Sequence, residues 1–278
     1  MQISIFTDEI SRADPQRAIR LAAAWGATHV EVRTLLSDRF PRVGDEEMET
    51  FHSWVRDAGL SVSGVSPGYC KCRLDDPSIP QALAEGFPRA CEWARRMDTD
   101  LISGFAVIRD DAATVPYEAP AAAVDLMGRM ADVVQQHGCR LVIENEPICW
   151  GATGLEAADI VRQIGADRIG LCWDPGNAAH AGSERPYPDE YAQIKDLVRH
   201  VHMKNYDADT AGWSLLERGV VDWPGQLRAL RDDGYDGFAV VETHVGKRVD
   251  DYTVPDQDLT DLETNTFRNF AFVRDVLR

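Results

Sequence analysis

The stretch RIGLCWDPGNAAHAG, residues 168–182, decides how the rest of the chain is interpreted. Its first half is mostly apolar as far as Asp174, where the sequence turns at once through Pro-Gly-Asn. A short apolar run bounded by Pro and Gly is typical of a buried strand. Such a strand presents its final carboxylate to a partner, so the first question is what Asp174 binds.

Segments of the same kind recur along the chain, and helix-like stretches separate them. The strand-like segments are residues 2–6, 28–33, 61–66, 100–105, 140–146, 168–174, 198–204 and 237–243. The stretches with apolar residues at helical spacing are residues 14–27, 45–60, 81–97, 121–138, 155–165, 188–197, 223–234 and 262–277. Eight alternating strand–helix units predict an α/β fold with a parallel sheet, the (β/α)8 TIM barrel.

A doubly wound open sheet is the alternative to the barrel. It usually has fewer units and often a glycine-rich phosphate loop, and neither GxGxxG nor GxxxxGK[ST] occurs in this sequence. The sequence contains no Ser/Gly linker and no low-complexity run, so residues 1–278 are predicted to form a single domain. The polar stretch 244–261 follows the last strand and is expected to lie over the catalytic face.

Composition limits the class of protein and of partner. The 278 residues are 44% hydrophobic and 27% charged, as in ordinary globular proteins. The net charge of −17 argues against nucleic acid as a partner and, more weakly, against an anionic membrane surface. The sequence has no signal-peptide pattern and no apolar run approaching the roughly 20 residues that span a bilayer. We therefore expect a cytoplasmic protein, and the sequence leaves open whether it is a homo-oligomer.

The cysteines indicate a reducing compartment. Six occur, at positions 70, 72, 91, 139, 149 and 172, and none forms a CxxC pair. In a chain of this size this usage predicts free thiols. Cys70 and Cys72 are poor candidates for a structural zinc site because no second Cys or His pair has metal spacing.

Four consecutive strands carry candidate metal ligands at the end where barrels perform chemistry. The fifth segment contains Glu144, the sixth ends on Asp174, the seventh carries His202 and the eighth contains Glu242. Carboxylates gathered without a cation repel one another, and a divalent metal removes this repulsion. Taken singly, each residue is more simply explained by solvation, a salt bridge or a core hydrogen bond. Their concurrence predicts a metal site of the oxygen-rich kind that suits Mn²⁺, Mg²⁺ or Co²⁺.

Further polar residues near the same rim are candidate substrate contacts, namely Lys204, Asn177, His180, Glu146, Glu9 and Arg33. Structural explanations compete with this role. A salt bridge to Glu146 or Asp207 would account for Lys204, a Glu31–Arg33 pair for Arg33, and solvent exposure for His180. Three tryptophans, Trp150, Trp173 and Trp213, could wall the pocket, although core packing is the better explanation for any single one of them.

The segments LVIENEP, GLCWDPGNAAHAG, VRHVHMKNYD and FAVVETH, in this order and spacing, resemble the xylose-isomerase-like superfamily of TIM-barrel sugar isomerases and epimerases. TDEIS and VEVR nearer the N-terminus extend the resemblance over essentially the whole chain. It implies one divalent ion, Mn²⁺ as first choice and Mg²⁺, Co²⁺ or Zn²⁺ as alternatives, held by Glu144, Asp174, His202 and Glu242. It also implies a small carbohydrate substrate, with Glu144 and Glu242 as acid and base on its opposite faces.

The sequence departs from the epimerase pattern at two positions. Many epimerases have a histidine where this chain has Asn177, and an arginine shortly after the seventh-strand histidine, where this chain has Lys204 instead. The His-x-Lys form resembles hydroxypyruvate-isomerase and inosose-dehydratase relatives. Two activities therefore stay open. The first is isomerisation or epimerisation of a ketose or keto-sugar through an enediolate, and the second is a lyase or dehydratase reaction on a keto-sugar, inosose, dehydroshikimate-like or 3-keto-glycoside substrate.

Overall fold

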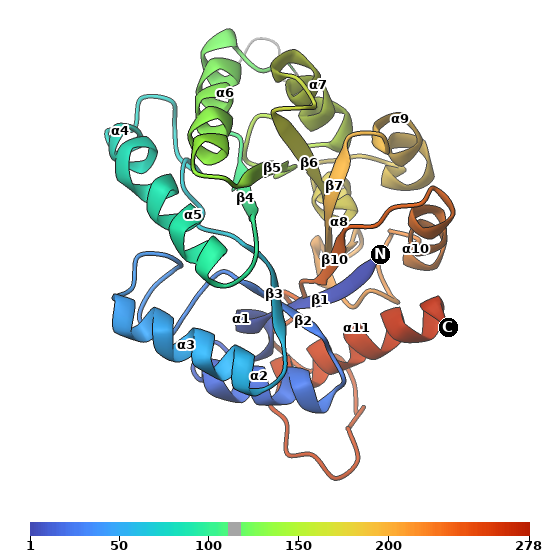
Figure 1. The fold of residues 1–278 in the computed structure, drawn as a ribbon. Helices are drawn as coiled ribbons and strands as arrows, with labels where there is room; N and C mark the ends of the chain where they lie inside the picture. The colour runs from blue at the N-terminus through green and yellow to red at the C-terminus, as the bar shows by residue number, and fades with distance from the viewer. Residues whose placement is uncertain (111–117) are drawn as a thin grey trace.

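Eight parallel strands close into a barrel in the computed structural model, which describes residues 1–110 and 118–278 (Figure 1). The strands are β1 (Gln2–Phe6), β2 (His29–Val32), β3 (Ser61–Val65), β4 (Leu101–Phe105), β5 (Arg140–Glu144), β6 (Ile169–Trp173), β7 (Val198–Met203) and β10 (Phe238–Val241). They follow one another around the barrel in chain order, and β10 pairs with β1 to close it. The predicted (β/α)8 TIM barrel is therefore confirmed.

Helices surround the barrel and cover the outer, apolar faces of its strands (Figure 1). The longer ones are α2 (Pro15–Ala24), α3 (Asp45–Asp57), α5 (Phe87–Arg96), α6 (Ala121–Gln136), α7 (Gly154–Ile164), α10 (Trp223–Asp232) and α11 (Asp261–Leu277). Shorter pieces are α1 (Thr7–Ile10), α4 (Ile79–Gln81), η1 (Ala82–Gly86), α8 (Pro175–His180), η2 (Pro186–Glu190) and α9 (Tyr191–Ile194). Helix α11 contacts both α10 and α1, so it completes the ring.

The region between β6 and β7 differs from the sequence prediction. A helix was expected at residues 188–197; this range holds the end of η2 and the short α9, and an additional helix, α8, precedes them. Tyr187, between Pro186 and Pro188, has non-helical backbone angles because a residue before proline is disfavoured in the helical region, so a regular helix does not extend through this position. Helix α8 begins directly at Asp174, whose Oδ1 accepts a hydrogen bond of 2.8 Å from the backbone N–H of Asn177.

The strand register determines which side chains enter the barrel. Glu144 pairs with Cys172, and Cys172 pairs with His200, so these three side chains share one face of the sheet. Together with Leu101 and Val142, Cys172 forms a small apolar cluster separate from the main core. Because side chains alternate along a strand, the residues two positions further on, Asp174 and His202, point the same way one layer nearer the C-terminal rim.

The stretch after β10 was expected to lie over the catalytic face, and this is true only of its beginning. His244 lines the central cavity. Further along, Asp250 forms ion pairs with Arg218 and Arg268, and Asn265 of α11 donates hydrogen bonds to the carbonyl groups of Val245 and Lys247. Donor groups of Asn265 and Arg268 on α11, together with Arg218, thus hold the carbonyl groups and the carboxylate of this stretch beside the helix. Within the described residues, no helix is both long and apolar enough to cross a membrane.

We predict that Gly154→Ala destabilises the barrel. A β-carbon at Gly154 would lie 2.4 Å from Cζ3 of the buried Trp173 and 2.8 Å from Ile194, and such overpacking costs about 1–3 kcal/mol. Urea denaturation would measure the loss of unfolding free energy. Gly246→Ala is the matched control, because nothing lies within 4 Å of a β-carbon there. Equal stability of the two variants would contradict this account of the packing.

Candidate active site

The four residues predicted as metal ligands meet at the C-terminal rim of the barrel. Glu144 is the last residue of β5, Asp174 and Glu242 directly follow β6 and β10, and His202 lies near the end of β7. One potential ligand atom from each residue lies within 4.8 Å of those of the other three. All four side chains are buried. The structure therefore brings together residues that are far apart in the sequence.

The polar atoms of this cluster fit a cation. Asp174 Oδ2, His202 Nδ1 and Glu242 Oε2 are buried and form no hydrogen bond among the described residues, and their charged neighbours are Lys204, 3.1 Å from each of the two oxygens, and Glu144, 3.1 Å from the nitrogen. Buried polar atoms are normally hydrogen-bonded, so these three can still accept a cation. Carboxylate oxygens and one imidazole nitrogen form a donor set that divalent cations such as Mg²⁺, Mn²⁺ and Zn²⁺ accept. These residues could hold a metal ion.

Lys204 is buried beside the same carboxylates. Its Nζ lies 3.1 Å from Asp174 Oδ2, 3.1 Å from Glu242 Oε2 and 3.4 Å from Glu144 Oε1. The structural alternative offered by the sequence, a salt bridge to Glu146 or Asp207, is wrong for this residue. Glu146 pairs instead with Lys71, whose Nζ is 2.8 Å from Glu146 Oε2. Lys204 thus places one positive charge at the centre of the site.

The carboxylates respond differently to this environment. Burial alone would raise the pKa of Glu144, but His202 and Lys204 lower it to about 2. The pKa of Glu242 is also lowered despite burial, by Lys204, His244 and Arg33. Burial raises the pKa of Asp174 well above its usual value, and Glu144 and Glu242 raise it further. One lysine therefore does not balance three carboxylates, and a bound cation would favour the ionised form of all three.

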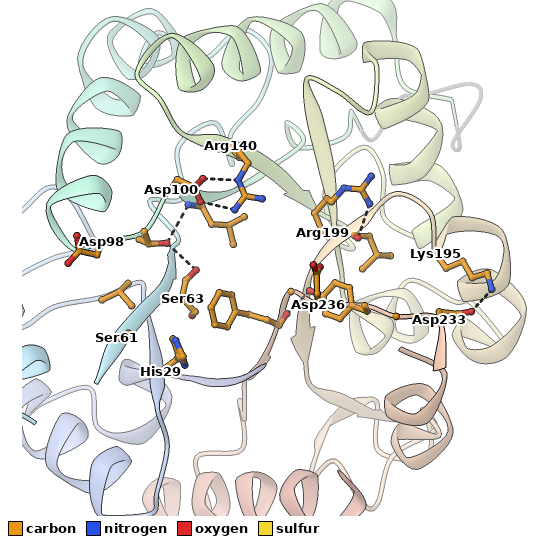
Figure 2. A pocket seen from close by; sticks show the side chains of 18 of the residues that line it. His29, Ser61, Ser63, Asp98, Asp100, Arg140, Lys195, Arg199, Asp233 and Asp236 are labelled. Atoms are coloured by element: carbon orange, nitrogen blue, oxygen red, sulfur yellow. Dashed lines mark hydrogen bonds and ion pairs between the residues drawn. The ribbon is translucent and has the colours of Figure 1, made fainter. Parts of the chain in front are cut away.

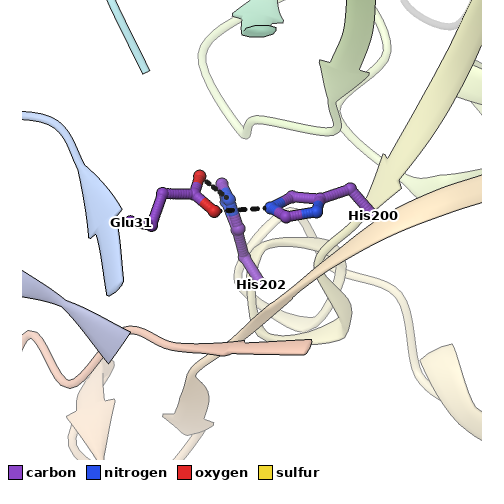
Figure 3. A group of neighbouring side chains, drawn as sticks. All are labelled: Glu31, His200 and His202. Carbon is purple, nitrogen blue, oxygen red and sulfur yellow. Dashed lines mark hydrogen bonds and ion pairs between the residues drawn. The ribbon is translucent and has the colours of Figure 1, made fainter. Parts of the chain in front are cut away.

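A buried carboxylate on β2, a strand that does not pair with β7, orients the candidate histidine ligand (Figure 3). Glu31 of β2 lies 2.7 Å from His200 Nε2 and 3.2 Å from His202 Nε2, and all three side chains are buried. With Nε2 engaged by Glu31, the Nδ1 atom of His202 faces the carboxylate cluster, 3.1 Å from Glu144 Oε2. A carboxylate bonded to the far nitrogen is the usual way to fix a metal-binding imidazole.

Sequence reasoning missed this role of Glu31, which it had placed in a structural pair with Arg33. The available signal was the alternation of His200 and His202, which predicts that both imidazoles face the barrel interior. Buried imidazoles need hydrogen-bond partners, and an acidic residue on another inward-facing strand is the natural candidate. The sequence could not show that the partner lies on β2, because β2 does not pair with β7.

Two asparagines lock the ends of β5 and β6 together. The side chain of Asn145 donates to the backbone carbonyl of Asp174 at 2.8 Å and accepts from its N–H at 2.8 Å. Asn177 donates to Glu144 Oε1 at 3.0 Å and to the carbonyl of Asn145 at 2.8 Å. Asn177 was predicted to contact substrate, and in the structure its amide positions a candidate ligand. Asn145 was not singled out in the sequence.

Arg33 and His244 hold the Oε1 atom of Glu242 in place. Arg33 donates through Nε to Asp8 Oδ2 at 2.9 Å and through its terminal nitrogens to Glu9 and Glu242. His244 lies 2.7 Å from Glu242 Oε1, and its backbone N–H donates to Glu9. Arg33 therefore does not form the pair with Glu31 that the sequence suggested.

A cavity of about 250 Å³ opens onto the cluster and is large enough for a small polar molecule. It is lined by Phe6, Arg33, Arg39, Ser66, Lys71, Phe105, Glu144, Glu146, Asn177, His202, Lys204, Trp213, Glu242 and His244. Among the predicted substrate contacts, Lys204, Asn177, Glu146 and Arg33 are in this lining, whereas His180 and Glu9 are not. Arg39, Lys71 and His244 line the cavity without having been named from the sequence.

Of the three tryptophans that were candidates for the pocket wall, Trp213 lines the cavity, whereas Trp150 and Trp173 do not, and neither does His180. Trp213 lines the cavity, carried there by the hairpin of β8 (Asn205–Asp207) and β9 (Gly212–Ser214). Trp173 belongs to the core, where its indole N–H donates to Gln226. His180 is exposed and stacks on Tyr206 with ring centres 5.0 Å apart.

A second and larger hollow, of about 960 Å³, lies at the opposite, N-terminal end of the barrel (Figure 2). Residues at the beginnings of strands, such as His29 and Ser61, line it. Charged groups around it pair with one another, as in Arg140 with Asp100 at 2.7 Å and Lys195 with Asp233 at 2.6 Å. This end of a TIM barrel contributes stability, whereas chemistry occurs at the other end. We therefore place the candidate site in the smaller cavity.

We predict that Glu31→Gln destabilises the protein at neutral pH. His200 and His202 lower the pKa of Glu31 from 4.5 to about 2. Because the folded-state pKa lies below the unfolded value, the stabilisation is complete above pH 4.5 and is lost as the pH falls towards 2. It amounts to about 3 kcal/mol. Denaturant unfolding should show the variant weaker than wild type at pH 7 by this order, with the gap narrowing below pH 4.5.

The exposed Glu46→Gln is the control for this experiment, since a surface substitution of this type changes stability by about 0.5 kcal/mol or less. A Glu31→Gln variant as stable as the control at pH 7 would contradict the proposed link between Glu31 and the two histidines.

The family is shown by comparison with known proteins. A model of the xylose isomerase-like TIM barrel family matches residues 19–269, so the chain belongs to this family. The resemblance seen in the four sequence segments is confirmed at this level.

Two curated proteins are similar to the chain at low identity. The match to the uncharacterized protein MJ1311 of Methanocaldococcus jannaschii is 23% identical over 119 residues, 42% of this chain and 41% of that protein. The chain thus spans less than half of that relative. The match to an inosose isomerase of Bacillus velezensis is 19% identical over 244 residues, 84% of each protein.

Solved structures share the fold over nearly their full length. A D-psicose 3-epimerase from Clostridium cellulolyticum H10, solved with D-tagatose, has a TM-score of 0.74 at 18% identity, covering 100% of both chains. The probable 3-DHS dehydratase AsbF from Bacillus anthracis has a TM-score of 0.74 at 15% identity, covering 98% of each. A xylose isomerase-like protein from Mycobacterium smegmatis, in complex with magnesium, scores 0.69 at 17% identity and covers 100% of this chain and 96% of its own. At these identities the likeness shows the fold alone.

Proposed function

We propose that this protein is a divalent-metal-dependent isomerase or epimerase that acts on a ketose or keto-sugar through an enediolate. The observation that carries the proposal is the buried cluster of Glu144, Asp174, His202 and Glu242, whose potential ligand atoms lie within 4.8 Å of one another beside a small polar cavity. The names of similar proteins, a sugar epimerase, a dehydratase and an inosose isomerase, support a small carbohydrate substrate.

The metal would be held by these four residues. A divalent cation there supplies Lewis-acid chemistry, because it polarises a substrate carbonyl and stabilises the negative charge that develops on oxygen. The magnesium complex of the Mycobacterium smegmatis protein supports a divalent ion in this fold. Mn²⁺ stays our first choice, with Mg²⁺, Co²⁺ and Zn²⁺ as alternatives, since oxygen ligands with one imidazole accept all four.

Glu144 and Glu242 are the candidate acid and base. They come from β5 and β10, which are separated by β6 and β7, so they approach the cavity from different directions. Arg33 and His244 hold one oxygen of Glu242, and Asn177 holds one oxygen of Glu144. Each carboxylate keeps its other oxygen on the cluster side, where it can take a proton from a carbon next to the carbonyl or return one.

A dehydratase or other lyase reaction is the second candidate, and Lys204 is the feature that favours it. Its ammonium group lies within 3.4 Å of Glu144 and Glu242 and lines the cavity. After proton removal by a carboxylate, an ammonium in this position can protonate a departing hydroxyl or alkoxide and so complete an elimination. Both candidate reactions begin with the same proton abstraction.

We predict that the purified protein binds about one divalent ion per chain and that Asp174→Asn lowers its affinity sharply. Removing one carboxylate takes away a ligand and a charge from the cation. Titration with Mn²⁺ and elemental analysis would measure this, and binding of metal to wild type should raise its melting temperature. The exposed Asp209→Asn should bind metal like wild type. An unchanged melting temperature after chelation would count against a resident metal.

We predict that the two carboxylate variants Glu144→Gln and Glu242→Gln differ in solvent exchange. With D-tagatose as probe in D₂O, one variant should fail to exchange the hydrogen next to the carbonyl, while the other still exchanges it without turnover. NMR and mass spectrometry would follow deuterium, at saturating Mn²⁺ with occupancy measured because both residues are candidate ligands. Turnover by wild type with no deuterium in the product would indicate an internal hydride shift and overturn the proton-transfer mechanism.

A further inference from the structure

Arg39 is a cation in the cavity wall that the proposed chemistry does not use. It lies in the loop after β2, where Thr34 and Arg39 form an isolated antiparallel bridge that returns the chain towards the rim. Its side chain is partly buried and lines the same cavity as Glu144 and Lys204. It therefore faces the space in which a substrate of the candidate site would lie.

The guanidinium of Arg39 is held in place by neutral groups. Its Nε donates to the carbonyl of Ser66 at 3.0 Å, and its Nη2 donates to Ser66 Oγ at 3.0 Å. A β-carbon at Gly68, which has a φ of +67°, would lie 2.5 Å from Cζ of Arg39, so only glycine leaves room for the guanidinium there. The side chain is thus anchored along one edge and packed on one face.

Among the described residues, the opposite edge of the guanidinium of Arg39 has no partner. An arginine has five N–H donors, and only the two bonds to Ser66 are formed within residues 1–110 and 118–278. No carboxylate of the described residues lies within ion-pair distance of Arg39. Burial and the neighbouring Arg33 lower the pKa of Arg39 to about 10, as expected for a cation without a counter-ion.

The other cations of the cavity are already balanced. Arg33 contacts three carboxylates, Lys71 is 2.8 Å from Glu146, and Lys204 lies among the cluster carboxylates. Arg39 is the cation of this lining, within the described part of the chain, that carries a charge without an acidic partner. Its free N–H groups match the two oxygens of a planar anion.

We propose that Arg39 binds a carboxylate group of the substrate, which makes the substrate an acidic keto-sugar rather than a neutral one. The inference rests on the proposed function, because it places this carboxylate on a molecule whose carbonyl sits at the metal cluster. A carboxylate accepts two parallel N–H bonds from one guanidinium, and it is small enough for a cavity of about 250 Å³ that must also hold the sugar.

The test compares sugars that differ at one carbon. D-Tagatose, D-tagaturonate and D-tagatose 6-phosphate carry a hydroxymethyl group, a carboxylate and a phosphate, respectively, at the same end of the chain. Calorimetry with the Mg²⁺-loaded protein would give a dissociation constant for each. We expect the uronate to bind about 10- to 100-fold more tightly than tagatose, the range typical of a hydrogen-bonded charged group.

Variants assign this preference to Arg39. Arg39→Met should bring the ratio of the two affinities to near one, and Arg39→Lys should keep only part of it because an ammonium lacks the planar fork. Arg42→Met is the matched control: this exposed arginine of the same loop lies 4.6 Å over the ring of Tyr69 and outside the cavity lining, so it should keep the wild-type ratio. Metal content and melting temperature of each variant confirm that it is folded and loaded.

Each other outcome overturns the inference. Equal affinity of wild type for tagatose and tagaturonate would overturn it, as would no measurable binding of either, or an equal loss of preference in Arg42→Met. Tighter binding of the 6-phosphate than of the uronate, lost in Arg39→Met, would replace the carboxylate by a phosphate. Failure of the proposed function is separate, because it would appear as absent metal and absent solvent exchange, whereas the preference is read from binding alone.

Discussion

The confinement of three carboxylates to one buried space is the constraint on which the rest of this structure depends. Glu144, Asp174 and Glu242 reach the same rim from three strands, away from water. Like charges in such a place are costly unless positive charge lies among them. Lys204 supplies one such charge from within the chain, 3.1 Å from Asp174 Oδ2 and from Glu242 Oε2. Neither oxygen forms a hydrogen bond among the described residues. In the proposed function, metal affinity, proton transfer and the stability of the rim would all depend on these oxygens.

The barrel is suited to this constraint because its paired strands hold the backbone in place. Each carboxylate lies at or directly after the end of a strand that pairs with a neighbour on both sides, so repulsion cannot easily separate the groups. Around them, neutral and charged partners hold individual atoms: the Asn145 and Asn177 amides join β5 to β6, and Glu31 reaches across the interior to His202. Such supporting contacts determine where each side chain points. The proposed proton transfers, on a substrate that lies between two carboxylates, would require this positioning.

The sequence predicted the barrel and the four candidate ligands because both depend on local pattern. Strand-like runs that end on Glu144, Asp174 and Glu242, and the alternation of His200 with His202, are visible in short windows. The contacts that support these residues cannot be seen in short windows, because they join residues that are distant in the chain. The partners of Lys204 and of Glu31 lie on other strands, and the closed sheet determines which strands come together. For the same reason the sequence left a salt bridge to Glu146 or Asp207 open as an alternative explanation of Lys204, whereas in the fold Glu146 pairs with Lys71.

In the proposed function, the reaction and the choice of substrate depend on different parts of the site. The proposed acid and base and the candidate metal ligands belong to the strand ends, where the register leaves little freedom. Arg39, Lys71 and Trp213 belong to the loops that follow β2, β3 and β7, and they line the cavity without touching the cluster as ligands. Loops can change in length and composition while the barrel remains intact, so substrate choice can vary without disturbing the chemistry. This division is compatible with the fold being shared, at under 20% identity, by structures whose names describe an epimerase and a dehydratase.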